Sequence, residues 1–335
     1  MLSAQDLRGL YAIPPTPAKP GADRWDATDT VDLDETARLT EQLIRDGVSG
    51  FMVLGTTGEC ATLSREDYEA YVDCFLATVN QRVPTFVGTT ALGTHEIVRR
   101  IRFVRERGAS GTLLGMPMWQ PCTLEMAVQY YETMSGAFPD FPIMVYANPR
   151  AFRFDFPPAF WRQIVERAPT VIAAKYSEVG RLLAVLRASK GRVNFVPVDG
   201  TAYAFARLSP ETTTVAWATS CCMGPQPSIA LMDAILAGDW ERAKQVADDL
   251  AWAGEPSHAI SGDQQVFASY NIQLHRYEAE TAGYCNPGPT RPPYNYMPPE
   301  YVERAHETGR RWAQLREKYK DILGGHPQTP ALTGH

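Results

Sequence analysis

Eight short runs of apolar, β-prone residues recur along the first two thirds of the chain, and they constrain its fold more than any other feature. Most of these runs are continuously apolar, which is typical of parallel strands buried on both faces. Amphipathic stretches with helical spacing separate them, for example residues 31–47, 64–80 and 94–108. The runs are 10–17, 50–57, 84–91, 111–118, 142–149, 171–177, 194–201 and 213–220. Eight strand–helix units in succession predict an α/β fold of the (β/α)8 TIM barrel type.

A doubly wound open sheet is the alternative arrangement of such units. It fits less well, because LYAIPPTP stands at residues 10–17 where a GxGxxG turn would follow the first strand, and GTTGE at 55–59 has the wrong spacing for a phosphate cradle. We therefore predict a barrel over residues 1–223, additional C-terminal helices packed on it over 224–323, and a disordered tail over 324–335.

The extension has a helical pattern of its own. Residues 227–253 read as a helical hairpin broken at Gly238, which is a typical helix stop. A proline-rich connector over residues 286–300 leads into a last helix over 301–323. These helices are expected to pack on one side of the barrel and not to form a second catalytic domain.

Composition and charge limit the kinds of partner. The chain has 335 residues and a net charge of −6, with acidic and basic residues interspersed, so no basic face for nucleic acid is expected. The N-terminus lacks a secretory-signal pattern and no window is apolar enough to span a bilayer, which predicts a cytoplasmic protein without membrane contact. The six cysteines are scattered without CxxC pairs, so we expect neither disulfides nor a zinc site.

VIAAK at residues 171–175 carries a lysine into a run that otherwise reads as a buried strand. Lysine is rarely buried, and a strand-end lysine that reaches out to water is the ordinary alternative. In a barrel, however, catalytic residues lie at the C-terminal ends of strands, and alternation puts Lys175 on one face with the small Ala173 and Ser177. A neutral amine can form an imine with a carbonyl substrate. Lowering a lysine pKa from 10.4 toward 7 takes roughly 4 kcal/mol, which burial can supply.

Two other strand ends carry residues suited to the same chemistry. Tyr146, on the neighbouring strand, has a phenol that can transfer a proton to or from the amine. The hydroxyls of Thr56 and Thr57, with the backbone N–H groups of their glycine-rich turn, can bind a carboxylate. Taken singly, the tyrosine could be a core residue before a turn and the threonines a helix cap. Their position at the ends of strands two, five and six of one barrel favours a shared site.

These motifs resemble those of the dihydrodipicolinate synthase and N-acetylneuraminate lyase family of class I, Schiff-base aldolases. The family uses GTTGE, YANP and the strand lysine of AAKYS in this order. Four stretches are similar to the bacterial hydratase-aldolases of polycyclic aromatic degradation: GTTALGTHE (88–96), GMPMW (115–119), YANPRAFRFDFP (146–157) and RPPYN (291–295). Those enzymes act on trans-o-hydroxybenzylidenepyruvate or trans-2'-carboxybenzalpyruvate. The resemblance runs from about residue 10 to about residue 320.

The resemblance implies Lys175 as the Schiff-base residue and Tyr146 as the proton-transfer residue, with Thr57 beside them at the catalytic centre. The turn of Gly55, Thr56 and Thr57 would hold the pyruvate carboxylate. No metal or other cofactor is implied, because the covalent Schiff base through Lys175 activates the substrate. The implied partners are an aromatic 2-keto acid and pyruvate, and the implied assembly is a homotetramer.

The resemblance also places Trp217 and Asn271 in the active site, which would bring a C-terminal helix over the barrel mouth. Aromatic and sulfur side chains at that mouth are expected to line an apolar slot for the substrate ring. They are Trp119, Met116, Met118 and Trp217.

Other functions stay open. A lyase of a sugar keto acid would also form the imine, but its site would need more side chains that hydrogen-bond the hydroxyl groups of the sugar. The synthases that make dihydrodipicolinate carry an arginine five residues beyond the motif tyrosine, where this chain has Ala151, with Arg150 out of register. A metal-dependent aldolase would need histidines at strand ends, and none of the six is placed there. A pyruvate-sensing barrel without catalysis is the non-enzyme alternative. Arg150 and Arg153 slightly favour an ortho carboxylate on the substrate ring.

Overall fold

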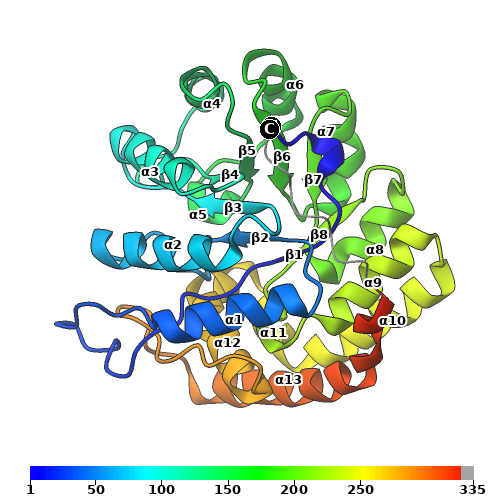
Figure 1. Ribbon diagram of the computed structural model, residues 1–335. Helices are drawn as coiled ribbons and strands as arrows, with labels where there is room; N and C mark the ends of the chain where they lie inside the picture. Colours follow the sequence, from blue (N-terminus) through cyan, green and yellow to red (C-terminus); the bar gives the residue numbers. More distant parts are fainter. Residues whose placement is uncertain (326–335) are drawn as a thin grey trace.

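The protein, described over residues 1–325 by a computed structural model, is built around one sheet of eight parallel strands. Helices surround these strands on the outside (Figure 1). Neighbouring strands follow the order β7-β6-β5-β4-β3-β2-β1-β8. The strands are Gly9–Ala12 (β1), Gly50–Val53 (β2), Thr85–Gly88 (β3), Gly111–Leu114 (β4), Ile143–Tyr146 (β5), Val171–Lys175 (β6), Asn194–Val196 (β7) and Val215–Ala218 (β8). Each overlaps one of the eight apolar runs, so the predicted barrel is confirmed.

The barrel closes between β7 and β8, where a single bridge takes the place of a ladder. Val198 and Trp217 form this parallel bridge, and the backbone N–H of Trp217 donates to the Pro197 carbonyl at 2.9 Å. The indole Nε1 of Trp217 also donates to the Val196 carbonyl at 3.1 Å. Trp217 therefore fastens the closing seam with its backbone and its side chain.

Local sequence signals begin the helices that cover the barrel. Asp32, Ser64 and Thr123 each accept a hydrogen bond from the backbone N–H three residues on, which caps the first turn. The covering helices are Leu33–Arg45 (α1), Arg65–Val79 (α2), Thr94–Glu106 (α3), Leu124–Ala137 (α4), Pro149–Phe152 (α5), Pro158–Arg167 (α6), Leu182–Ser189 (α7), Asp199–Leu208 (α8) and Gln226–Ala237 (α9). Their apolar faces pack on strands that are buried on both sides.

Helix α9 follows β8 and packs on β1 and β8, which is the place of the eighth barrel helix. The predicted boundary at residue 223 groups this helix with the extension, whereas α9 packs on the barrel strands. Gly238, with φ +71°, ends α9 at the expected break of the hairpin. The added layer consists of Trp240–Gly254 (α10), His258–Ser261 (α11), Gln264–Ala282 (α12) and Pro299–Lys318 (α13). In Figure 1, α12 and α13 lie together along one side of the barrel.

Short 3₁₀ turns connect several of these elements. They are Ala4–Asp6, Val179–Arg181, Ser220–Met223, Glu255–Ser257 and Lys320–Gly325. The expected disordered tail falls mainly on residues 326–335, which lie outside the described residues. Within residues 1–325, no helix is long and apolar enough to cross a membrane.

A buried ion cluster ties the added layer to the barrel. Glu59 stands in the loop after β2, and its side chain is completely buried. Its Oε2 accepts hydrogen bonds from Arg276 of α12 and, at 2.6 Å, from Arg291 of the proline-rich connector. Both guanidinium groups are almost fully buried, and their other N–H groups donate mainly to backbone carbonyls, including that of Thr16. One buried carboxylate thus pairs with two guanidinium groups that water hardly reaches.

We predict that Glu59→Gln lowers the free energy of unfolding by about 3–5 kcal/mol, because it leaves two buried guanidinium groups without their counter-ion while keeping the side-chain volume. Glu41→Gln is the matched control, since Glu41 pairs with Arg82 at the exposed surface and such pairs contribute little. Urea unfolding followed by circular dichroism measures both. Equal stabilities of the two variants would contradict the role given to Glu59.

Candidate active site

The barrel register brings the two principal candidates side by side. Tyr146 is the last residue of β5 and pairs with Lys175, the last residue of β6. Both open into a cavity of about 380 Å³ at the C-terminal ends of the strands. Seven of the residues expected at the site line this cavity: Gly55, Thr56, Thr57, Tyr146, Lys175, Trp217 and Asn271. The alternation expected along β6 is also present, because Lys175 and Ser177 line the cavity while Tyr176 packs outside it.

Lys175 lies between two aromatic rings and has no acidic partner. Its Nζ is 3.3 Å from the centre of the Trp217 ring and 4.8 Å from that of Tyr146. No carboxylate within residues 1–325 forms an ion pair with it. Burial lowers the pKa of Lys175; the Tyr146 phenolate opposes this and the charge of Arg150 reinforces it. The amine is therefore more often neutral than that of an ordinary lysine.

Tyr146 is held by two hydrogen-bonding neighbours. Its hydroxyl lies 2.7 Å from Thr56 Oγ1 and accepts from Asn148 Nδ2 at 3.3 Å. Burial alone would raise the pKa of Tyr146, but the charge of Lys175 and the hydrogen bonds from Thr56 and Asn148 outweigh it, and the pKa is lowered. The pKa values of the phenol and of the Lys175 amine are thus both lowered from their ordinary values, which suits proton transfer between them near neutral pH.

Asn148 is fixed in turn by the chain that follows β5. Its Oδ1 accepts from the Ala151 N–H at 3.2 Å, so it caps α5, and Pro149 occupies the first helical position. The YANP motif therefore ends a strand, starts a helix and aims an amide at the phenol of Tyr146.

The turn after β2 is bent sharply enough to present its backbone to the cavity. Leu54 and Glu59 flank it, and both have φ +57°, a left-handed conformation that is rare outside glycine. At Gly88 of β3 a side chain would meet the Leu54 carbonyl at 1.9 Å, so only glycine permits this path. Within residues 1–325, the N–H and hydroxyl of Thr57 have no hydrogen-bond partner. They are free to bind an anionic group such as a carboxylate.

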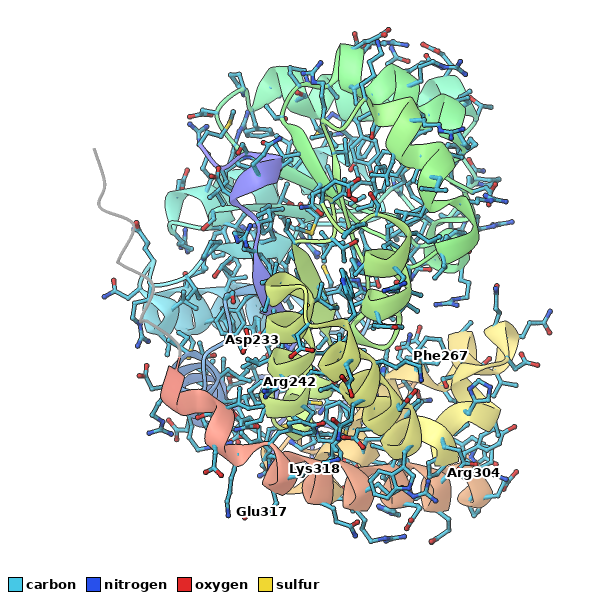
Figure 2. All side chains as sticks on the ribbon, turned by 90° about the vertical axis from the view of Figure 1, so that its right-hand side faces the viewer. Asp233, Arg242, Phe267, Arg304, Glu317 and Lys318 are labelled. Carbon is cyan, nitrogen blue, oxygen red and sulfur yellow. The ribbon has the colours of Figure 1, made fainter. Side chains whose placement is uncertain are left out.

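Helix α12 and the end of α11 form the outer wall of the cavity. Phe267, Asn271 and His275 follow one another at intervals of four, which places them on one face of α12. Figure 2 shows Phe267 where the yellow helical layer meets the green part of the barrel. The Oδ1 atom of Asn271 is buried without a hydrogen-bond partner, so the amide is available to a bound molecule. Ser261 of α11 completes this wall.

Sequence reasoning found Asn271 by resemblance but missed Phe267, His275 and Ser261. An aromatic, an amide and an imidazole at helical spacing are a usable signal, but only once α12 is known to cover the barrel mouth. Asn148 and Arg150 also line the cavity. The Arg150 guanidinium lies 5.1 Å from the centre of the Phe267 ring.

Three residues of the expected apolar slot lie elsewhere. Met116 is fully buried in the core and Trp119 is 77% exposed, so neither lines the cavity of Lys175. Met118 lines a second cavity of about 230 Å³, which shares Thr56 and Tyr146 with the first. The cause is the turn after β4, where Gly115 packs directly on the Phe152 ring. The apolar walls beside Lys175 come instead from Ile13, Leu113, Val198, Trp217 and Phe267.

The two loop arginines after β5 differ in position. Arg150 lines the cavity, whereas Arg153 is exposed and donates to the Trp119 carbonyl at 3.0 Å. Among residues 1–325, no group of three or more histidine, cysteine or acidic side chains is arranged to hold a metal ion.

Comparison with known proteins gives consistent matches. The model of the dihydrodipicolinate synthetase family matches residues 23–252. A trans-O-hydroxybenzylidenepyruvate hydratase-aldolase of Pseudomonas putida is 43% identical over 322 residues, which cover 95% of this chain and 96% of that protein. A trans-2'-carboxybenzalpyruvate hydratase-aldolase of Nocardioides sp. strain KP7 is 38% identical, with 96% and 98% covered.

A solved structure, described as PhdJ bound to substrate intermediate, superposes with a TM-score of 0.91 at 36% identity. The match covers 95% of this chain and 99% of that one. The similarity therefore includes the added helical layer and not the barrel alone.

We predict that Arg150→Gln moves the pH dependence of pyruvate imine formation upward by up to about one pH unit, because the lost positive charge no longer lowers the pKa of Lys175. The shift is measured as the rate at which the cyanoborohydride-trapped adduct forms, followed by mass spectrometry across neutral and alkaline pH. Arg153→Gln is the control, because Arg153 lies outside the cavity. A profile that stays in place in Arg150→Gln, or moves equally in both variants, would refute this electrostatic coupling.

Proposed function

Since the chain belongs to the dihydrodipicolinate synthetase family, we propose that it is a class I hydratase-aldolase that cleaves a trans-benzylidenepyruvate to an aromatic aldehyde and pyruvate. One observation carries the proposal: Lys175 is half-buried, forms no ion pair within residues 1–325, and lies in register with Tyr146 in an apolar-walled cavity covered by the added helices. Nearly full-length similarity to hydratase-aldolases of both named kinds supports it. The ordinary setting of such an enzyme is the catabolism of aromatic hydrocarbons such as naphthalene or phenanthrene.

The first step is imine formation. The neutral Lys175 amine attacks the keto carbon of Ar–CH=CH–CO–COO⁻, and Tyr146 supplies the proton with which the oxygen leaves as water. The substrate carboxylate is bound by the turn of Gly55, Thr56 and Thr57, whose Thr57 N–H and hydroxyl are unpartnered. Catalytic roles thus fall to Lys175, Tyr146 and Thr57.

The cationic imine then acts as the electron sink for two steps. Water adds at the benzylic carbon while the alkene electrons move toward the imine, which leaves an enamine that is protonated on carbon. In the second step the benzylic hydroxyl loses its proton, the adjacent C–C bond breaks, and its electron pair again enters the imine. Protonation and hydrolysis of the resulting enamine release pyruvate and the free amine. The imine supplies the electron sink, so we propose that no metal or other cofactor takes part.

The walls of the cavity favour an aromatic substrate over a sugar. Leu113, Val198, Trp217 and Phe267 supply apolar and aromatic surface suited to a flat ring. Asn271 is placed on the outer wall with a free amide oxygen and can orient the hydroxyl of the hydrated intermediate. Ala151 in place of an arginine, as noted from the sequence, weighs against condensation with aspartate semialdehyde.

Arg150 gives a specific reason to consider the carboxylated substrate as well as the hydroxylated one. It is a cation at the cavity, and it forms no ion pair within residues 1–325. The greater identity to the hydroxybenzylidenepyruvate enzyme points the other way. The homotetramer and the cytoplasmic location stay predictions.

We expect the purified protein to release pyruvate and the aromatic aldehyde from both trans-o-hydroxybenzylidenepyruvate and trans-2'-carboxybenzalpyruvate, measured by absorbance and a coupled pyruvate assay. Lys175→Ala should lower kcat by roughly 10³-fold or more, because no other lysine of residues 1–325 lines the cavity. Lys190→Ala, at an exposed lysine, is the control and should match the unmodified protein. Turnover of a sialic acid with none of either benzylidenepyruvate would overturn the proposal in favour of a sugar keto acid lyase.

A further inference from the structure

His275 stands on α12 in the wall of the cavity that contains Lys175. Its ring Nδ1 lies 3.0 Å from Oε2 of Glu278, one turn along the same helix. A carboxylate only accepts hydrogen bonds, so Nδ1 carries the proton and the neutral ring keeps its lone pair on Nε2. Nε2 has no hydrogen-bond partner in the described part of the chain. The basic nitrogen of the ring is therefore the one that no hydrogen bond occupies.

The second carboxylate oxygen of Glu278 is also hydrogen-bonded. Its Oε1 accepts from the Ser257 hydroxyl at 2.7 Å, and that hydroxyl lies 2.8 Å from Thr308 Oγ1 of α13. The Glu278 and Thr308 side chains are buried. A buried carboxylate with fixed partners that orients an imidazole is the arrangement by which enzymes set the tautomer of a catalytic histidine.

Other charged groups also surround His275. Asp199 of α8 shares a second cavity of about 250 Å³ with His275 and Glu278. Its Oδ2 is already bound by the hydroxyls of Ser220 and Ser228, each at 2.6 Å, so it does not compete for the imidazole. On the side of the active site, the titratable side chains that line the same cavity as His275 are Tyr146, Arg150 and Lys175.

Elimination among these groups points to one base for the benzylic end of the substrate. Lys175 is consumed in the imine, and an arginine is not deprotonated in proteins. Tyr146 is bound to Thr56 at the carboxylate end, whereas the benzylic carbon lies two carbons beyond the imine carbon. Asn271, one turn before His275, can orient a hydroxyl but cannot take its proton.

We propose that His275 is the base for the benzylic carbon and that Glu278 is its positioning residue, an assignment that rests on the function proposed above. In hydration, Nε2 takes one proton from the water whose oxygen bonds to the benzylic carbon. The alkene pair forms the enamine, and Tyr146 protonates the enamine carbon. Water in the cavity returns the proton from the imidazolium to the phenolate. In cleavage, Nε2 takes the hydroxyl proton, the C–C pair enters the imine, and the aldehyde leaves.

The test distinguishes chemistry at the imine end of the substrate from chemistry at the benzylic end. Exchange of the pyruvate methyl protons with deuterated solvent, followed by NMR, needs only the imine and enamine formed on Lys175 and proton transfer by Tyr146. We expect His275→Gln to keep this exchange within about twofold while losing roughly 10²–10⁴-fold in kcat for benzylidenepyruvate cleavage. Imidazole added to His275→Ala should restore part of the rate. His306→Gln is the matched control, since His306 bonds Thr281 away from the cavity.

The kinetic parameters of Glu278 variants test its positioning role. Glu278→Gln replaces an acceptor oxygen by an amide donor, so the Nδ1–H of His275 loses its fixed partner. We expect kcat for cleavage to fall by about tenfold while KM and pyruvate exchange stay within about twofold, and Glu278→Asp should restore part of kcat. Unchanged cleavage in His275→Gln, or equal loss of exchange and cleavage, would overturn the assignment. Absence of exchange in the unmodified protein would overturn the proposed function, and this inference with it.

Discussion

The carboxylate of Glu59 is the point on which the barrel, the site loop and the helical wall all depend. It belongs to the same GTTGE turn that presents Thr57 to the cavity, and it neutralises Arg276, the residue next to His275 on α12. Arg291 binds the same oxygen from the proline-rich connector. Because charges without water need their counter-ions, the turn and α12 are held in one arrangement. The wall of the active site is therefore positioned by an ion cluster outside the cavity.

The aromatic residues around Lys175 determine the reactivity of its amine. Trp217 and Tyr146 pack against the amine without offering a carboxylate, and burial lowers the pKa of Lys175. Trp217 can do so because it also closes the seam between β7 and β8. The residue that completes the barrel thus also desolvates the nucleophile, and a loosened seam would change both.

The strands of the barrel and the two principal residues of the site could be predicted from the sequence. The eight strands were identified because each is a continuous apolar run, and the positions of Lys175 and Tyr146 followed from their place at strand ends, which the barrel brings together. The features that the sequence did not predict depend on contacts between distant parts of the chain. The turn containing Met116 and Trp119 could be assigned to the barrel mouth, but the packing of Gly115 on Phe152 decides which side chains face inward.

The position of α12 in the cavity wall could not be predicted from local sequence patterns either. Its position is set by the contact of Arg276 with Glu59, 217 residues away in the chain, and no local pattern reports such a pairing. Without it, Phe267 and His275 read as ordinary positions of an amphipathic helix. The place of α9 as the eighth barrel helix was missed for a related reason, because a helix that completes a ring and one that begins an extension look alike in sequence.

In the proposed mechanism one amine, Lys175, carries both the hydration and the cleavage. Borohydride quenching of a single turnover with trans-o-hydroxybenzylidenepyruvate, followed by peptide mass mapping, distinguishes this mechanism from the alternatives. We expect a reduced adduct on the peptide of Lys175, first with the mass of the whole substrate and later with that of pyruvate. Substrate consumed without any adduct, or an adduct on another lysine, would rule the mechanism out.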